Sequence, residues 1–202
     1  MRKSTAKSRP NTRQLTAIAM MSAFSIILSL PFLQFPMPLF PSFLKIDFAD
    51  LPALIGGFIL GPAAGIAIEL VKNIIGLFWT QTAGIGELAN FLVGGALVGV
   101  AGGIYRAMKR KNRTRALFCL IAGIIAMAAM GALANWLLIL PFYAHLMPMD
   151  AIIALCRAII PAVHNIAGVV FYTIIPFNLF KGVIIGAITF LTYNKLTPLL
   201  RM

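Results

Sequence analysis

Two aspartates in the segment "KIDFAD" are placed so that their carboxylates could do chemistry together. Asp47 and Asp50 stand one helical turn apart, and Glu69 follows in the next apolar stretch. Carboxylates at such spacing can hold a metal ion or act as acid and base. Neither a D-D-x-x-D pattern nor a histidine cluster accompanies them. An enzyme that uses Asp47, Asp50 and Glu69 remains one alternative, but the sequence favours another use of these charges.

The motifs of nucleotide and hydrolytic chemistry are missing from the sequence. It contains no phosphate-binding G-x-x-x-x-G-K-[ST], no H-E-x-x-H, no G-x-S-x-G and no C-x-x-C. The chain alone therefore cannot couple ATP hydrolysis to any process. Its two cysteines, Cys119 and Cys156, have no metal-like spacing and are read as buried free thiols. We expect no catalytic residue, no metal and no cofactor.

A second group of polar residues stands inside long apolar segments, where polar side chains usually face a cavity or a partner. Asn178 and Lys181 are three residues apart and so share one helical face. With Asn135 they offer donors and acceptors suited to a ligand with carbonyl and imide-like edges. We expect one outward-opening pocket to gather most of the group: Glu69, Lys72, Asn73, Glu87, Asn90, Asn135, His164, Asn165, Asn178 and Lys181.

Three simpler roles compete with ligand binding for members of this group. Lys181 could extend its ammonium group to the membrane surface. Glu69 and Lys72, three residues apart, could form a structural ion pair. His164 could be an ordinary interfacial residue.

The composition identifies the elements that must position these residues. The chain has 202 residues, of which 60% are hydrophobic and 11% charged, whereas soluble domains carry about 25% charged residues. Several apolar segments of 18 or more residues indicate a membrane protein. These segments lack the alternation of apolar and polar residues that barrel strands show. The lipid bilayer is thus the first partner, and helices are the expected elements.

The basic residues indicate the orientation in the membrane. The net charge is +12, and the positive charges cluster beside the apolar segments: in the tail 1–14, in "RAMKRKNRTR" and at Lys195 and Arg201. Clusters of this kind mark cytoplasmic segments. They lack the interleaved aromatic residues of a nucleic-acid surface, so no nucleic-acid partner is expected.

Parity then sets the number of crossings. Apolar segments 15–35, 51–71 and 86–105 precede the basic loop, and 116–143 and 168–194 follow it. A cytoplasmic tail and loop require an even number of crossings between them, so residues 72–84 must contribute to one more. This segment is too short to span the bilayer alone as a helix, so it joins the end of the preceding helix or thins the membrane locally. We predict an all-α integral membrane protein with six transmembrane helices and both termini cytoplasmic. Residues 15–200 form one domain, with a cytoplasmic loop 106–115 and external loops 36–47 and 144–167.

Small residues at intervals of four predict close helix packing. Gly57, Gly61 and Gly65 form one such series, and the others are Gly95, Gly99 and Gly103, then Gly182 and Gly186. We expect these series to pack within the chain. Ala19 and Ala23 form a similar pair near the start of the first helix, where contact with another protein is the rival interpretation.

Four segments together carry a family resemblance. They are "FLKIDFADLPALIGGFILGPAAGIAIELVKNIIG", "GELANFLVGG", "NWLLILPFYA" and "IPFNLFKG". The combination resembles the substrate-binding S components of energy-coupling factor (ECF) vitamin transporters, nearest to the riboflavin-specific type. The resemblance covers residues 13 to 200, and the last two segments carry its riboflavin-specific part.

The resemblance implies function, partners and site residues. It implies high-affinity capture of riboflavin outside a prokaryotic cell membrane, for import driven by a membrane scaffold subunit and two cytoplasmic ATPase subunits. The S component would topple in the bilayer to deliver the vitamin. Asn135, Asn178 and Lys181 would hold the flavin, and the loop between the first two helices would place Phe43, Leu44 and Lys45 over it. Ala19 and Ala23 would contact the scaffold.

Some expectations stay open within this resemblance. Arg157 and His164 match no family motif, and a few substitutions can change the vitamin, so pantothenate or a thiamin precursor remains an alternative substrate. "KIDFAD" would be the hinge where the covering loop enters the second helix, with Asp47 and Asp50 capping its first turn. The proline-rich segment upstream cannot be helical.

Overall fold

The structure is a computed structural model that describes residues 12–109, 112–146 and 148–200. Most of the predicted basic tail 1–14, together with Arg110, Lys111 and Arg201, lies outside these residues.

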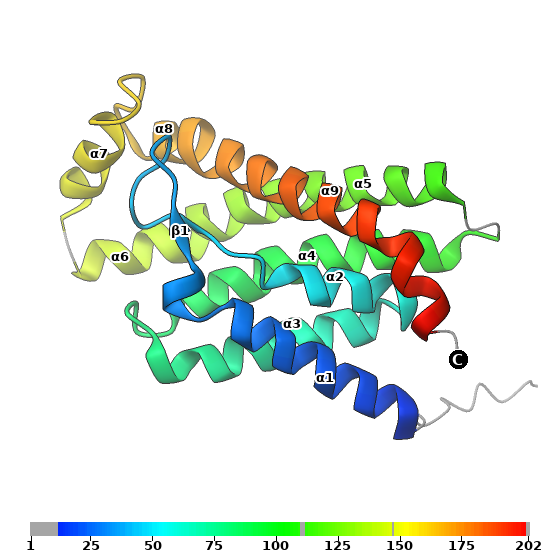
Figure 1. The fold of residues 1–202 in the computed structure, drawn as a ribbon. Helices are drawn as coiled ribbons and strands as arrows, with labels where there is room; N and C mark the ends of the chain where they lie inside the picture. Colours follow the sequence, from blue (N-terminus) through cyan, green and yellow to red (C-terminus); the bar gives the residue numbers. More distant parts are fainter. Residues whose placement is uncertain (1–11, 110–111, 147, 201–202) are drawn as a thin grey trace, which may run out of the picture.

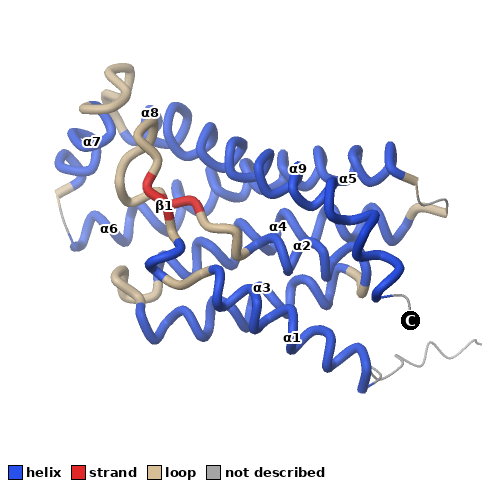
Figure 2. Tube along the Cα trace, viewed as in Figure 1, coloured by secondary structure: helices blue, strands red, loops and turns tan. Residues whose placement is uncertain are grey.

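Helices dominate the described chain (Figures 1 and 2). A two-stranded antiparallel hairpin, with Phe35 opposite Ile46 and Pro36 opposite Lys45, interrupts them after the first helix. Short 3-10 helices at Pro31–Leu33 (η1) and Leu77–Trp79 (η2), and π-helical turns at Asn135–Ile139 (η3) and Val170–Ile174 (η4), complete the main elements. The α-helices and β-strands are α1 Thr12–Leu28, β1 Phe35–Pro36, β2 Lys45–Ile46, α2 Asp50–Ile59, α3 Pro62–Gly76, α4 Ile85–Ala107, α5 Arg113–Ala134, α6 Leu140–Leu146, α7 Met149–Arg157, α8 Ile166–Val169 and α9 Ile175–Leu200.

Four helical stretches are long and apolar enough to cross a membrane. They are Pro62–Trp79, Ile85–Ala107, Arg113–His145 and Ile166–Thr192, while α1 and α2 are shorter apolar helices. The described start of α1, the end of α9, the end of α4 and the start of α5 lie at one end of the molecule (Figure 1). The hairpin, α6, α7 and α8 lie at the other end.

The prediction of one helix over 51–71 is wrong, whereas the alternative that the segment 72–84 joins the end of the preceding helix agrees with the structure as far as Trp79. The chain turns at Gly61, whose φ of 107° favours glycine. Pro62 then begins α3 as its first residue, a position where its missing N–H costs nothing. Residues 51–71 thus contain two helices, and α3 with η2 runs on to Trp79.

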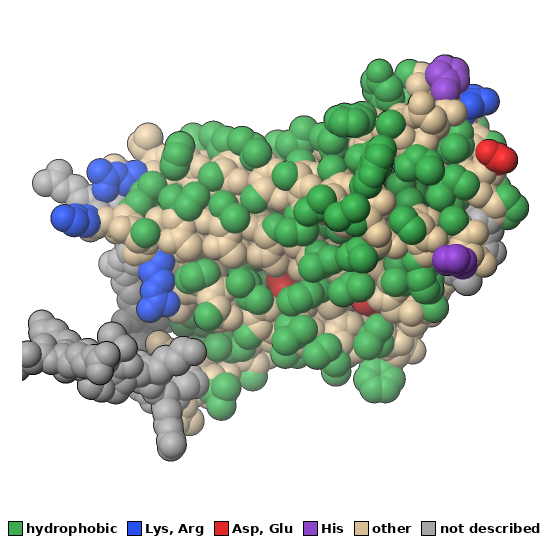
Figure 3. Space-filling model, turned by 180° about the vertical axis from the view of Figure 1, so that it is seen from behind, with side chains coloured by type: hydrophobic (Ala, Val, Ile, Leu, Met, Phe, Trp, Pro, Cys, Tyr) green, Lys and Arg blue, Asp and Glu red, His purple; other side chains and the backbone are tan. Residues whose placement is uncertain are grey.

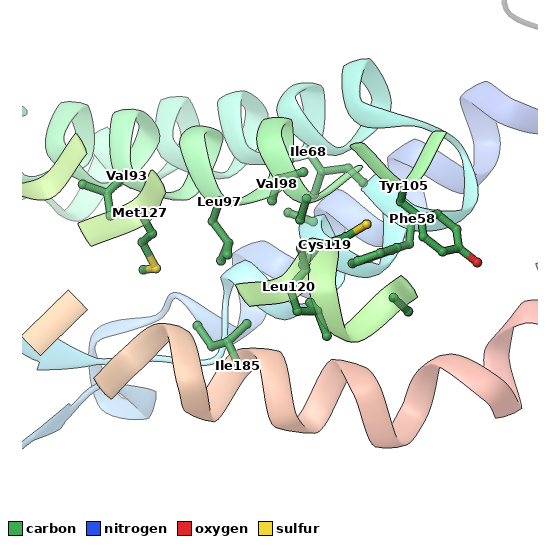
Figure 4. Close-up of a cluster of buried hydrophobic side chains, with 14 residues drawn as sticks. Phe58, Ile68, Val93, Leu97, Val98, Tyr105, Cys119, Leu120, Met127 and Ile185 are labelled. Carbon is green, nitrogen blue, oxygen red and sulfur yellow. The ribbon is translucent and has the colours of Figure 1, made fainter. Parts of the chain in front are cut away.

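A buried apolar cluster joins α2, α3, α4, α5 and α9 (Figure 4). Phe58 of α2 meets Tyr105 of α4 edge-on, with ring centroids 4.8 Å apart. Leu97 of α4, Met127 of α5 and Ile185 of α9 are fully buried in the same cluster. This core fixes the positions of α4, α5 and α9, which carry the polar residues of interest.

Glycines allow the close approaches, although only part of the predicted series does so. Gly182 and Gly186 of α9 pack on Ile124 of α5, as expected. Gly95 and Gly103 face open space among the described residues, whereas Gly99 packs on Ile66 of α3, so the predicted packing of the α4 series holds only at Gly99. Gly94 and Gly102, one residue earlier, make the tight contacts to α3 and α2, because the packed face of α4 is rotated by one position.

The surface is divided in the manner of a membrane protein. Apolar side chains cover the middle of the face in Figure 3, described Lys and Arg side chains gather mainly at one end, and histidines lie toward the other. Figure 3 thus matches the predicted bilayer environment and the clustering of positive charge.

Candidate functional site

A cavity of about 540 Å³ is lined by residues of the α1–α2 loop together with residues of α4, η3, α6, α7 and α9. This volume falls within the range of about 300–1,000 Å³ typical of small-molecule sites. All six residues predicted to bind the ligand line it: Phe43, Leu44, Lys45, Asn135, Asn178 and Lys181. The loop, α5–α6 and α9, far apart in the sequence, therefore bring these side chains to one place.

The α1–α2 loop contributes to the cavity lining and is held at its base and at its tip. The pairing of β1 with β2 joins the two arms of the loop at its base. At the tip, Phe40 lies edge-on to Phe177 of α9, at 5.3 Å between ring centroids, and 6.3 Å from Phe180. Residues 37–44 between the strands are non-helical, as the prolines predict.

Asn135 and Asn178 meet around Gly131 of α5. The Asn135 Nδ2 donates to the Gly131 carbonyl at 2.8 Å, and the Asn178 Nδ2 donates to the Ile174 carbonyl at 2.9 Å. A Cβ added at Gly131 would lie 2.6 Å from the Asn178 Nδ2. Each amide still has an oxygen and one N–H available for a further partner. The pair can therefore present both acceptors and donors to a polar ring edge.

Two π-helical turns shape the helices that carry these asparagines. Each turn ends two residues before a proline: η3 before Pro141 and η4 before Pro176. Proline lacks the N–H of the regular ladder, and a local π turn is one way a membrane helix adapts to it. Asn135 is the first residue of η3, and Asn178 lies one helical turn after the end of η4. Each asparagine is therefore within one turn of an irregularity in its helix.

A buried ion-pair cluster borders the cavity, and two of its members, Asp47 and Lys181, also line the cavity. Lys181 pairs with Asp50 at 3.0 Å and with Asp47 at 3.4 Å, and Lys72 pairs with Asp50 at 2.5 Å and Glu69 at 2.6 Å. All five side chains are at most 5% exposed. The Asp50 carboxylate thus bridges the two ammonium groups. The predicted ion pair of Glu69 with Lys72 is present.

The predicted capping role of the two aspartates is largely wrong. Ala49 precedes α2 as its N-cap and makes no side-chain cap, and Asp50 turns its carboxylate to the lysines. Asp47 accepts a hydrogen bond from the Ala49 N–H at 3.0 Å, which fixes the turn into α2. Ion pairing in the buried interior outweighs capping because a buried lysine needs a counter-charge.

The other members of the polar group lie in three places: the cavity wall, the ion-pair cluster and a separate hollow between α7 and α8. Glu87 and Asn90 line the cavity, and Glu87 accepts a hydrogen bond from Thr80 at 2.7 Å. Glu69, Lys72 and Asn73 lie outside the described lining, in and beside the ion-pair cluster. The prediction of one common pocket is therefore wrong for these three.

The segment between α7 and α8 is organised locally. The Arg157 Nε donates to the Val163 carbonyl at 2.9 Å, which explains a residue that the resemblance left open. His164 and Asn165 line a separate shallow hollow, so the expectation that they join the main cavity is also wrong. Asn165 caps α8 through the Gly168 N–H at 2.8 Å.

Ala19 and Ala23 lie exposed on the outer face of α1. Ser22 and Ser25 occupy the opposite, buried face, and the Ser25 hydroxyl donates to the Ala49 carbonyl. The two alanines thus form a small-residue stripe that another helix could approach.

Sequence reasoning missed several residues of the site. Gly131 carries no signal by itself, because its importance arises only when α9 packs against α5. Phe40 stands in a proline-rich segment and shows its role only through contacts with α9. The apolar lining has an ordinary core composition; it includes Val93, Ile139, Leu140 and Phe177.

Known proteins resemble this chain over nearly its whole length. Residues 13–193 match the family model described as ECF transporter, substrate-specific component. The riboflavin transporter RibU of Staphylococcus aureus (strain TCH60) is 33% identical over 94% of this chain and 93% of its own length. The riboflavin transporter FmnP of Bacillus subtilis (strain 168) is 34% identical, with coverages of 92% and 93%.

The fold agrees with these sequence matches. A solved structure described as the S component of a bacterial ECF transporter superposes with a TM-score of 0.72 at 31% identity, covering 94% of this chain and 98% of that one. The chain therefore belongs to the family of substrate-specific components of ECF transporters.

Proposed function

We propose that this chain captures riboflavin from outside the cell as the S component of an ECF-type importer. The observation that carries the proposal is the convergence of Asn135, Asn178 and Lys181 with the loop residues Phe43, Leu44 and Lys45 on one cavity. Amide and ammonium groups would bind the ring edge and ribityl hydroxyls, and apolar side chains would lie along the ring face. The relatives named as riboflavin transporters support this ligand.

The order of the helices and the predicted parity of crossings support a membrane arrangement, which we propose as follows. Six helical segments (α1, α2, α3, α4, α5 with α6, and α8 with α9) cross the bilayer of a prokaryotic cell membrane. Both termini and the α4–α5 connection are cytoplasmic, because basic residues gather at that end. The cavity then opens to the outside. In this arrangement, residues 36–47 and 144–167 are the external loops of the chain, residues 106–115 are its cytoplasmic loop, and residues 1–14 are a cytoplasmic tail.

Import requires partners because the sequence carries no nucleotide-binding motif. A membrane scaffold subunit would contact the Ala19–Ala23 face of α1, and two cytoplasmic ATPase subunits would supply the energy. The chain itself would bind and deliver, with no reaction of its own. The carboxylates that an enzyme would use, Asp47, Asp50 and Glu69, are engaged by lysines instead.

A flavin titration tests this function. The ligand-depleted protein in detergent should quench riboflavin fluorescence stoichiometrically at nanomolar concentration, whereas pantothenate and thiamin precursors should not compete. Competition by one of these solutes, with riboflavin fluorescence unchanged, would move the chain to another S component.

A further inference from the structure

We propose that Asp50 is a positioning residue for the ligand, acting through Lys181. This inference rests on the proposed riboflavin function. Asp50 lies behind Lys181, outside the described residues that line the cavity, so it would not touch the ligand itself. Its Oδ2 holds the Lys181 ammonium at 3.0 Å, the shorter of that lysine's two carboxylate contacts.

The position of Asp50 is defined from three sides. Its Oδ1 lies 2.5 Å from the Lys72 Nζ on α3. The carbonyl of the preceding residue, Ala49, accepts one hydrogen bond from the Ser25 hydroxyl of α1, and the Ala49 N–H donates to the Asp47 carboxylate. Asp50 is only 1% exposed. A carboxylate held in this way gives Lys181 a fixed direction, whereas a long lysine side chain beside a cavity would otherwise adopt many rotamers.

The charge balance of the cluster makes this role separable from stability. Three carboxylates face two ammonium groups, so loss of one carboxylate leaves the numbers equal. Without the charge of Asp50, Lys181 still has Asp47 and Lys72 still has Glu69. Asp50→Asn therefore leaves no lysine without a counter-charge, which is the usual reason that breaking a buried ion pair unfolds a protein.

The same balance supplies a matched control. Glu69 is 0% exposed and belongs to the same cluster, but it forms its ion pair with Lys72 and not with Lys181. Glu69→Gln and Asp50→Asn each remove one buried carboxylate and keep the shape of the side chain. They differ in whether the lost carboxylate touches Lys181.

The experiment measures the riboflavin Kd and the ligand-free melting temperature of wild type, Asp50→Asn, Glu69→Gln, Lys181→Met and the Asp50→Asn/Lys181→Met double variant. We expect Asp50→Asn to raise Kd at least fivefold and Glu69→Gln to change it less than twofold. In the double variant, Asp50→Asn should add little to the effect of Lys181→Met, because its influence passes through the lysine. A purely structural role would lower the melting temperature without producing this non-additivity.

Several outcomes would overturn the inference. Wild-type affinity in Asp50→Asn, an equal loss in Glu69→Gln, or additive effects in the double variant would each show that Asp50 does not act through Lys181. If Asp50→Asn fails to fold, Asp50→Glu keeps the charge and moves it by one methylene; unchanged affinity there would equally contradict positioning. A wild-type protein that does not bind riboflavin would instead contradict the proposed function.

Discussion

Asn178 and Lys181 stand one helical turn apart on α9, and both lie in the wall of the cavity. Each side chain is at most 6% exposed. A polar group of the ligand that is buried beside them loses its hydrogen bonds to water and must find a partner among these side chains. We predict that Asn178→Ala and Lys181→Ala each weaken riboflavin binding tenfold or more, or about 1.4 kcal/mol. Fluorescence titration measures the change. Leu179→Ala, at a 38% exposed neighbour, is the matched control; wild-type affinity in both site variants would remove these residues from the site.

Gly131 provides a second prediction at the scale of single residues. A methyl group there would meet the Asn178 Nδ2 at 2.6 Å and push the amide away from its position. Gly131→Ala should therefore weaken riboflavin binding about tenfold, similar to loss of one buried hydrogen-bonding group of about 1–2 kcal/mol. Gly103→Ala, which meets open space among the described residues, should bind as wild type. Equal affinity of the two variants would show that Asn178 is not constrained by α5.

Single residues were predictable where their type was informative in the sequence. Asn135, Asn178 and Lys181 attract notice because polar groups in apolar segments are costly, and the structure brings them together around one cavity. The true partners of Asp50 were not predictable, because Lys72 and Lys181 reach it from elsewhere in the chain. Local capping rules favoured a helix-end role for Asp50, and long-range charge pairing overrode them.

The α1–α2 loop is the element most open to a kinetic test. Phe40 is the side chain that anchors its tip on α9 through Phe177 and Phe180. Such aromatic pairs contribute about 0.5–1.5 kcal/mol, so Phe40→Ala should speed riboflavin dissociation roughly two- to tenfold. Stopped-flow release of bound flavin measures the rate. Phe32→Ala, at a residue 75% exposed, should leave it unchanged; equal rates in the two variants would contradict a loop held by Phe40.

Helices were predictable as a class, whereas their interruptions were less so. The Gly61–Pro62 turn was present in the sequence as a strong punctuation signal, but the long apolar run around it favoured one continuous helix. The π turns at η3 and η4 depend on how the neighbouring helices accept the displaced backbone, which a single sequence does not show. The glycine series on α4 was misplaced by one position because apolarity on all faces hides which face packs.

At the scale of the whole molecule, the outer face of α1 should act independently of the cavity. Ala19 and Ala23 are exposed on this face, while the cavity lies among other elements. We predict that Ala19→Leu/Ala23→Leu retains riboflavin affinity but loses copurification with the membrane scaffold subunit, because larger side chains prevent close helix approach. Ala129→Leu, at an exposed position of α5, is the control. Copurification at the wild-type level would exclude this face as the interface.

The measurement that tests the central claim most directly is titration of the ligand-depleted wild-type protein with riboflavin, followed by fluorescence quenching. The cavity and its amide and ammonium groups predict saturable quenching with one flavin per chain at nanomolar concentration. Fluorescence that stays unchanged at a large excess of the folded protein would contradict riboflavin as the ligand, while leaving the family and the fold in place.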